Sequence, residues 1–93
     1  MRYNFEWDEI KSRKNQRKHG VKFEEAKTVF DDEHSITISD PDHSTEEERY
    51  IDIGMTSRNR ILVVVYTERN AIIRIISSRK ATQEEQKVYE QNR

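Results

Sequence analysis

The sequence has no cysteine, a single proline and only two glycines among its 93 residues. Without cysteine the chain can form neither a disulfide framework nor a zinc site built on thiolates, which fits a reducing cytoplasm. No apolar run approaches the roughly 20 residues that cross a membrane, and the start of the chain lacks the apolar core of a signal peptide. We therefore expect a soluble cytoplasmic protein without a membrane partner.

Apolar residues are also scarce, at 32% of the chain against 38% charged residues. A chain of this length forms one domain, residues 1–93, and its core should be thin unless a partner adds buried surface. The 17 basic and 18 acidic residues leave a net charge of −1. That balance excludes an overall polycation but says nothing about local patches.

Periodicity and capping residues predict a strand, two helices, four strands and a final helix. Asp8 caps the first helix, Gly20 ends it, and Thr82 with Glu85 forms a capping box for the last one. The strands are expected at residues 3–7, 35–40, 49–56, 60–68 and 72–79, and the helices at residues 8–19, 23–30 and 82–91. The fold class is therefore α+β: a curved antiparallel sheet, made of a four-stranded meander plus a short N-terminal strand, with two N-terminal helices and one C-terminal helix covering one face.

The segment 60–80, RILVVVYTERNAIIRIISSRK, holds most of the apolar residues, and two registers compete for its hairpin. A two-residue loop would place Arg74 among valines, and an unpaired buried cation costs several kcal/mol. A three-residue loop, residues 69–71 with a bulge, gives one apolar face instead, so we favour it. The core face would then carry Ile61, Val63, Val65, Ile73 and Ile75. The opposite, solvent-facing side would carry Tyr66, Glu68, Arg74 and Lys80, with Arg79 turned away from it.

A run of five cations without an acid lies in the first helix. Its members are Lys11, Arg13, Lys14, Arg17 and Lys18. Such a run can neutralise the phosphates of RNA, although many charge runs are only solvated helix faces. The absence of acids favours RNA contact.

The three histidines are candidates for proton transfer, because imidazole titrates near neutral pH. His43 lies in a polar connection, where it could accept a proton or only stabilise the turn. His19 ends a helix, where capping of the last carbonyls is favoured over catalysis. His34 has no informative context. Their spacing does not fit a metal site, so we predict none.

Several blocks in a fixed order extend over most of the chain. They are FEWD (5–8), RKHGVKFEEA (17–26), VFDD (29–32), DPDHS (40–44), and ILVVVYTER (61–69) with IRIISSRKAT (73–82). In these blocks the chain resembles the BrnT family, the ribonuclease toxins of type II toxin-antitoxin systems. The departures are Lys22, where a small capping residue is usual, and the turn at Asn70, where glycine is common.

The resemblance implies a RelE-like fold, cleavage of messenger RNA that inhibits translation, and no cofactor. It also implies neutralisation by a BrnA-like antitoxin whose DNA-binding part represses the operon, so the complex would bind operator DNA. Metal-free RNA cleavage uses the 2′-hydroxyl as nucleophile and needs cations around a phosphorane. We expect Arg74 and Lys80 to stabilise it with help from Arg79, and Glu68 or His43 to accept the proton.

Tyr66 could stack an RNA base. The same cations could instead pair with Glu84 or Glu85 at the end of a strand, as exposed charges commonly do. Two other functions also fit the sequence. One is a nucleic-acid-binding module without catalysis, and the other is an interaction domain that docks through exposed Leu62, Val64 and Ile76.

Overall fold

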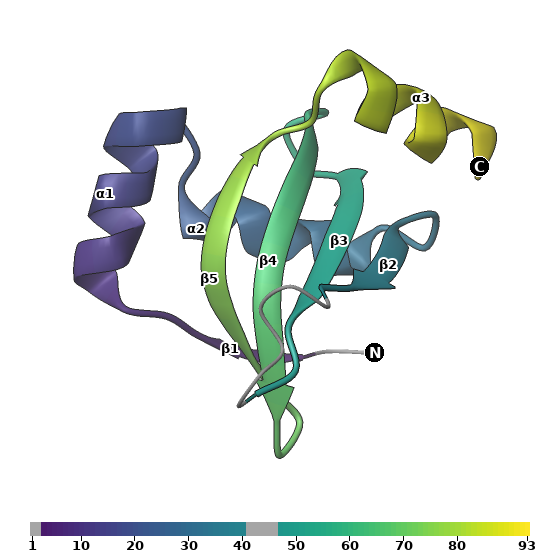
Figure 1. Cartoon of the computed structure of the whole chain (residues 1–93). Helices are drawn as coiled ribbons and strands as arrows, with labels where there is room; N and C mark the ends of the chain where they lie inside the picture. The colour runs from purple at the N-terminus through teal and green to yellow at the C-terminus, as the bar shows by residue number, and fades with distance from the viewer. Residues whose placement is uncertain (1–2, 41–46) are drawn as a thin grey trace.

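The structure is a computed structural model that describes residues 3–40 and 47–93, and these form an α+β fold, as predicted (Figure 1). The strands are β1 (Asn4–Glu6), β2 (Ile36–Ser39), β3 (Tyr50–Met55), β4 (Ile61–Arg69) and β5 (Ile72–Lys80). The helices are α1 (Glu9–His19), α2 (Phe23–Ala26), the 3-10 helix η1 (Lys27–Asp31) and α3 (Gln83–Gln91). The sheet has the order β1-β5-β4-β3-β2, in which β1 runs parallel to β5 and the other neighbours are antiparallel. In the described part of the chain, no helix is long and apolar enough to cross a membrane.

Helix α1 begins and ends where its capping residues predict. The Asp8 carboxylate accepts hydrogen bonds from the backbone N–H groups of Ile10 and Lys11, and Gly20 takes the left-handed conformation at φ 69°. The helix lies along the edge of β5 through buried Asn15, whose amide donates to the Ser78 carbonyl and accepts from the Ser78 N–H. Asn15 therefore replaces a neighbouring strand at this point of the β5 edge, beyond the reach of β1.

The second predicted helix, residues 23–30, is divided into α2 and the tighter η1. Lys22 provides no side-chain cap for α2. The segment is held instead by Glu25, whose carboxylate accepts two hydrogen bonds from the Arg60 guanidinium and one from the Thr56 hydroxyl. A buried ion pair between α2 and the start of β4 therefore fixes this helix.

The hairpin between β4 and β5 differs from the predicted one. Its turn has two residues, Asn70 and Ala71, with φ of 53° and 66°, as in a type I′ turn, whose twist matches that of the strands. The extra residue lies inside β5 instead, at Ile76, between the pairs Val65–Ser77 and Tyr66–Ile75. The predicted three-residue loop is therefore wrong.

The core lies on the face that the register prediction had left open. Leu62, Val64 and Tyr66 of β4 are buried with Ile73 and Ile75 of β5. Helices α2 and η1 cover this face through Phe23, Ala26 and Val29. The assignment of the Val63 and Val65 side to the main core is wrong, because two-residue pairing together with a mid-strand bulge places the apolar residues of β5 opposite the even-numbered residues of β4.

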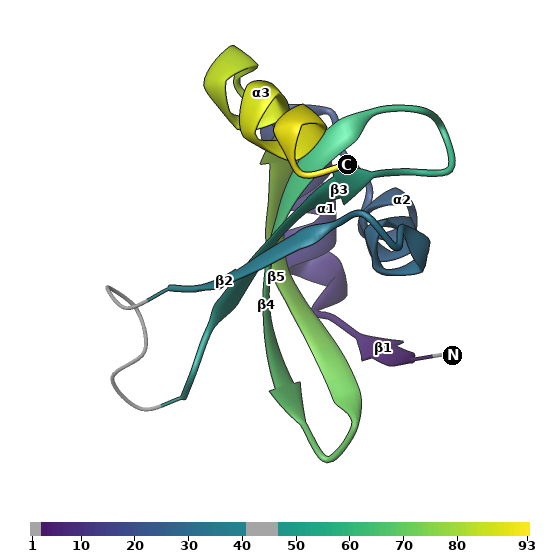
Figure 2. The same ribbon diagram turned by 90° about the vertical axis from the view of Figure 1, so that its right-hand side faces the viewer.

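Helix α3 packs on the other face of the sheet, near the end of β3 (Figures 1 and 2). Its buried Tyr89 belongs to one apolar cluster with Ile53 and Val63, and the Tyr89 hydroxyl donates to Asp32 Oδ2 at 2.5 Å. The expectation that all helices cover one face is therefore wrong for α3. This second, smaller cluster leaves the middle of that sheet face uncovered by helices. We call the sheet face on the α3 side the open face.

Candidate active site

The bulge in β5 places two arginines on the open face. Arg74 is paired with Thr67 and Arg79 with Val63, and residues opposite each other in a sheet share a face. Thr67 and Val63 are four residues apart on β4, so their side chains point to the same side, as do the two arginines. Their separation along the strands is roughly 13 Å at about 3.3 Å per residue. The prediction that Arg79 faces away from Arg74 is therefore wrong.

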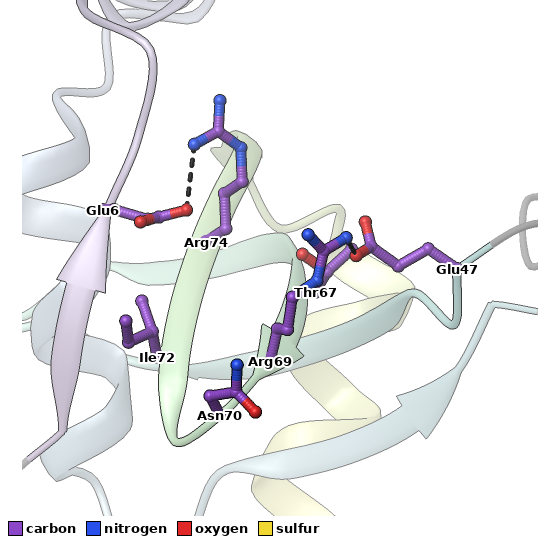
Figure 3. Close-up of a pocket in the computed structure, with 7 residues that line it drawn as sticks. All are labelled: Glu6, Glu47, Thr67, Arg69, Asn70, Ile72 and Arg74. Carbon is purple, nitrogen blue, oxygen red and sulfur yellow. Dashed lines mark hydrogen bonds and ion pairs between the residues drawn. The ribbon is translucent and has the colours of Figure 1, made fainter.

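A hollow of about 370 Å³ lies at the hairpin end of this face (Figure 3). It is lined by Glu6, Glu47, Thr67, Arg69, Asn70, Ile72 and Arg74. Arg74 Nη1 donates to Glu6 Oε2 at 3.0 Å, and Arg69 forms an ion pair with Glu47. Arg74 and Glu6 are about half exposed, so their pair contributes little to stability and a phosphate could compete for the guanidinium.

Arg74 also lies near the start of α1. The pKa of Asp8 is lowered, first by the hydrogen bond from the Lys11 N–H and further by the positive charge of Arg74. Sequence reasoning missed Glu6 as a neighbour of Arg74, because that contact depends on the parallel pairing of β1 with β5, between residues 68 positions apart. Neither local spacing nor capping residues indicate such a pairing.

A second hollow, which we call the groove, lies at the other end of β5 and measures about 410 Å³. Its polar wall is formed by the end of α1, by β5 and by the first turn of α3. The polar residues are Lys18, His19, Ser77, Ser78, Arg79 and Glu85. Its floor is apolar and is formed by Ile38, Ile51, Ile53, Val63 and Val65. The groove thus combines two cations, an imidazole and a carboxylate over an apolar floor.

Arg79 is held in the groove by Glu85. The guanidinium donates through Nη1 to Glu85 Oε1 at 2.8 Å and through Nη2 to Oε2 at 2.9 Å. This bidentate pair lowers the pKa of Glu85 to about 2 and raises that of Arg79. The pairing of a strand-end cation with Glu85, which the sequence left open, is therefore present. It fixes the plane of the guanidinium while leaving Arg79 partly exposed.

His19 belongs to the same groove. Its ring is half-buried and forms no side-chain hydrogen bond within residues 3–40 and 47–93, and the helix is ended by the Gly20 N–H instead. The interpretation of His19 as a carbonyl cap is thus wrong, because the ring turns toward β5, where it lines the groove with Lys18 and Arg79. One indication of this position is present in the sequence, namely that His19 is the last residue of α1 before Gly20. In the structure this end of the helix lies next to Ser77 and Arg79.

The basic run of α1 divides between two faces of the helix. Lys11, Lys14 and Lys18 line a hollow between α1 and β5, whereas Arg13 and Arg17 are exposed elsewhere on the helix. Lys18 also belongs to the groove, so the helix and the groove form one cationic surface.

Three predicted site residues, Tyr66, Glu68 and Lys80, do not lie on the same face of the sheet as Arg74. Tyr66 is 5% exposed in the core, and its hydroxyl donates to Asp52, so base stacking by Tyr66 as predicted is excluded by burial. Glu68 shares the helix-covered face with Tyr66 and Ile73. Lys80 is exposed but opposite Leu62, so strand alternation directs it away from Arg79. His43 lies outside the described residues.

The proposed docking surface of Leu62, Val64 and Ile76 is not exposed. Leu62 and Val64 are fully buried, and Ile76 is half-buried beside α1. The exposed apolar side chain on the open face is instead Ile38, at 49%, beside the groove floor. Among the described residues there is also no cluster of three or more histidine and carboxylate side chains that could hold a metal ion.

Residues 7–85 match the family model of the ribonuclease toxin BrnT of type II toxin-antitoxin systems. The chain belongs to the BrnT family. The crystal structure of the Brucella abortus ribonuclease toxin BrnT is similar in fold, with a TM-score of 0.67 and 22% identity, covering 88% of this chain and all of that one. A comparison with curated protein sequences finds no relative.

Membership of the BrnT family has two consequences for the site. It implies an antitoxin partner and indicates ribonuclease activity. The matched segment contains His19, Arg74, Arg79 and Glu85, whereas Glu6 lies just before it. The groove is therefore built entirely from the part of the chain that defines the BrnT family.

Proposed function

We propose that the protein is an endoribonuclease toxin with a RelE-like fold that cleaves RNA without a metal and so inhibits translation in the cytoplasm. The observation that carries the proposal is the common groove of His19 and Arg79. Attack of a 2′-hydroxyl on the adjacent phosphate needs a group that moves a proton and a cation that stabilises the phosphorane. The groove provides both kinds of group.

Arg79 is the group that stabilises the phosphorane. Its guanidinium is planar and is held on one side by both oxygens of Glu85, so it needs little reorganisation when charge develops on the phosphate. Because both oxygens of Glu85 are bonded to Arg79 and Oε1 also accepts the Thr82 N–H, Glu85 is a positioning residue rather than a base. Its role is to orient the guanidinium of Arg79.

His19 transfers the proton. The ring is partly exposed, lines the groove beside Arg79, and makes no competing hydrogen bond with the described residues. Lys18 adds positive charge at the same site. Arg74, roughly 13 Å along the sheet, holds a more distant phosphate of the same strand, and Glu6 orients its guanidinium. A role for His43 stays a prediction.

The proposed chemistry is tested by cleavage of single-stranded RNA in the presence of EDTA. We expect wild-type activity to persist, and His19→Gln and Arg79→Gln each to lower single-turnover cleavage by roughly 100-fold. Arg13→Gln is the control, because Arg13 is a cation of the same helix that lines neither hollow. Wild-type rates in both groove variants would overturn the assignment of the groove. Loss of activity in EDTA with recovery in magnesium would overturn metal independence.

The cognate antitoxin, of the BrnA type, is proposed to cover the groove and to carry the complex to operator DNA. An apolar floor with a cationic wall suits an amphipathic segment with acidic side chains. Ile38→Glu, at the exposed edge of this floor, should weaken antitoxin binding by roughly tenfold, as loss of an interface anchor does. Ile10→Glu is the control, since Ile10 is equally apolar and more exposed on α1. Equal binding by both variants would place the antitoxin elsewhere.

A further inference from the structure

The five cations of α1 form two stripes with different surroundings. Lys11, Lys14 and Lys18 follow spacings of three and four, which place them on one side of a helix. All three line the seam, as we call the hollow of about 300 Å³ between α1 and β5. Arg13 and Arg17 are also spaced by four, but they line none of the hollows along this surface. Helical geometry thus separates the run into three seam cations and two that face solvent.

The seam lies where α1 is tied to β5. The Asn15 amide bonds both backbone groups of Ser78, which ties the helix to the strand at one point. The floor is formed by Ile76 and Ser77, and Ile76 is the extra residue of the bulge. A bulge redirects the side chain of the extra residue, and here it leaves Ile76 half-buried beneath the lysines.

The seam cations are available to a ligand. None of the ion pairs within residues 3–40 and 47–93 involves Lys11, Lys14 or Lys18, whereas Arg74 and Arg79 each have a carboxylate partner. Three lysines side by side repel one another, so an external anion would relieve the repulsion. The seam therefore favours a polyanion over a neutral ligand.

The seam is continuous with the groove. Lys18, His19 and Ser77 line both hollows, so a chain that follows the lysines arrives at Arg79. At the other end of β5, Arg74 lines the hairpin hollow. Cations are thus found along β5 from the hairpin end to the groove.

We propose that the seam is a track for the sugar-phosphate backbone of single-stranded RNA, in which Lys11 and Lys14 neutralise phosphates next to the one bound in the groove. Arg13 and Arg17 take no part in it. A flexible single strand can follow a narrow seam with its bases over Ile76 and the groove floor, as single strands do in cationic grooves with apolar platforms. The inference rests on RNA as the ligand of the proposed function, but it concerns binding rather than cleavage.

The test compares two double variants that remove the same charge from the same helix. One is Lys11→Gln with Lys14→Gln, and the other is Arg13→Gln with Arg17→Gln. The probe is a fluorescein-labelled 2′-O-methyl oligouridylate of about 12 nucleotides, which lacks the nucleophile and lies within the size range of single-strand sites. Affinity is measured by fluorescence anisotropy between about 50 and 200 mM salt. Far-UV circular dichroism and thermal unfolding verify that both variants fold.

The lysine variant should flatten the slope of log affinity against log salt by about 1.4, at about 0.7 per neutralised phosphate of a single strand. The arginine variant should keep the wild-type slope. Equal flattening by the two variants would mean that only net charge matters, and an unchanged slope in both would mean that no phosphate lies in the seam. Either result overturns the track.

Two further arms separate this inference from the proposed function. A duplex of the same length that bound as tightly, with the same dependence on Lys11 and Lys14, would contradict a single-strand track. Because the probe is not cleavable, the expected slopes in a protein that cleaves no RNA would support the track while refuting the catalytic proposal. The opposite result is cleavage that depends on His19 and Arg79 but not on the two lysines, together with unchanged slopes. It would support the catalytic proposal while refuting the track.

Discussion

Arg74 and Arg79 lie on the same face of β5 although they are five positions apart in the chain. In a regular strand an odd separation places two side chains on opposite faces. The extra residue Ile76 restores the match, because Arg74 is opposite Thr67 and Arg79 is opposite Val63. One inserted residue therefore unites the two cations that the proposed chemistry needs on a single surface.

The two arginines should differ in kinetic signature. Arg79→Gln removes a group proposed to act in the transition state, so kcat should fall by roughly 100-fold with little change in KM. Arg74→Gln removes binding of a more distant phosphate of the same strand, so KM should rise about tenfold while kcat changes little. Steady-state cleavage of a fluorogenic RNA measures both constants. Arg13→Gln is the control for general loss of charge, because Arg13 lines neither the hairpin hollow nor the groove.

A large fall in kcat for Arg74→Gln would contradict this division of roles. It would place the reacting phosphate in the hairpin hollow, with Glu6 rather than His19 beside it. The same experiment with Glu6→Gln then decides between the hollows, because Glu6 does not line the groove.

The sequence predicted the parts of the fold that depend on neighbouring residues. Asp8 and Gly20 bound α1, and Thr82 with Glu85 begins α3, because caps and boxes act over three or four residues. The apolar run at the start of β4 also predicted a strand. It could not show which face is the core, because both faces of β4 carry valines, at Val63 and Val64.

The site was less predictable than the elements, because its contacts are long-range. The bulge at Ile76 has no local signal, since any of several β-branched residues in β5 could be the extra one. The approach of His19 to Arg79 depends on Asn15 binding Ser78, which lies 63 residues away. In the sequence, Asn15 is only an asparagine among charged residues, and nothing there indicates that contact. The residue types therefore suggested the chemistry, whereas long-range hydrogen bonds determine which of those residues lie together.

Ala71 stores strain in the hairpin turn. Its φ of 66° lies in the left-handed region, which costs a residue with a Cβ about 1 kcal/mol or more, and glycine avoids this cost. Ala71→Gly should therefore stabilise the protein by about 1 kcal/mol, measured by urea unfolding. Ala81→Gly is the matched control, because Ala81 is buried without a positive φ and should lose stability. A stability loss in Ala71→Gly as well would contradict a strained turn.

The ion pair of Glu25 and Arg60 should be a major determinant of stability. The Glu25 side chain is 6% exposed, and Arg60 donates to both of its oxygens. Arg60→Gln leaves a buried carboxylate without its cation and should cost about 3 kcal/mol near neutral pH. The double variant Glu25→Gln/Arg60→Gln should cost less than Arg60→Gln alone, because no charge stays buried. Urea unfolding of the three proteins tests this order.

The pH dependence of this pair has a defined sign. The hydrogen bond from Arg60 lowers the pKa of Glu25, so its stabilisation is present above the ordinary carboxyl range, near pH 4, and is lost as the pH falls through the lowered value. The difference between wild type and Arg60→Gln should therefore narrow toward acid. A constant difference down to the acid limit would show that Arg60 stabilises α2 by packing alone.

Asp52 should affect the pH dependence of stability in the opposite direction to Glu25. It is 3% exposed on β3, and burial raises its pKa although the Tyr66 hydroxyl donates to Oδ1 at 2.8 Å. In the unfolded chain the carboxyl ionises near pH 4, whereas the folded protein retains the proton to higher pH. Stability is thus lost as the pH rises from about 4 through the raised pKa and levels off above it.

Asp52→Asn removes this loss because the amide stays neutral and its oxygen can still accept the Tyr66 hydroxyl. The variant should match wild type near pH 3 and become more stable as the pH approaches about 8, measured as the free energy of unfolding in urea at each pH. Asp31→Asn, at an exposed position, is the control and should show no such divergence. If Asp52→Asn were less stable at every pH, the ionised carboxylate would be the form that the fold requires. In that case the hydrogen bond from Tyr66 would outweigh the cost of burying the charge.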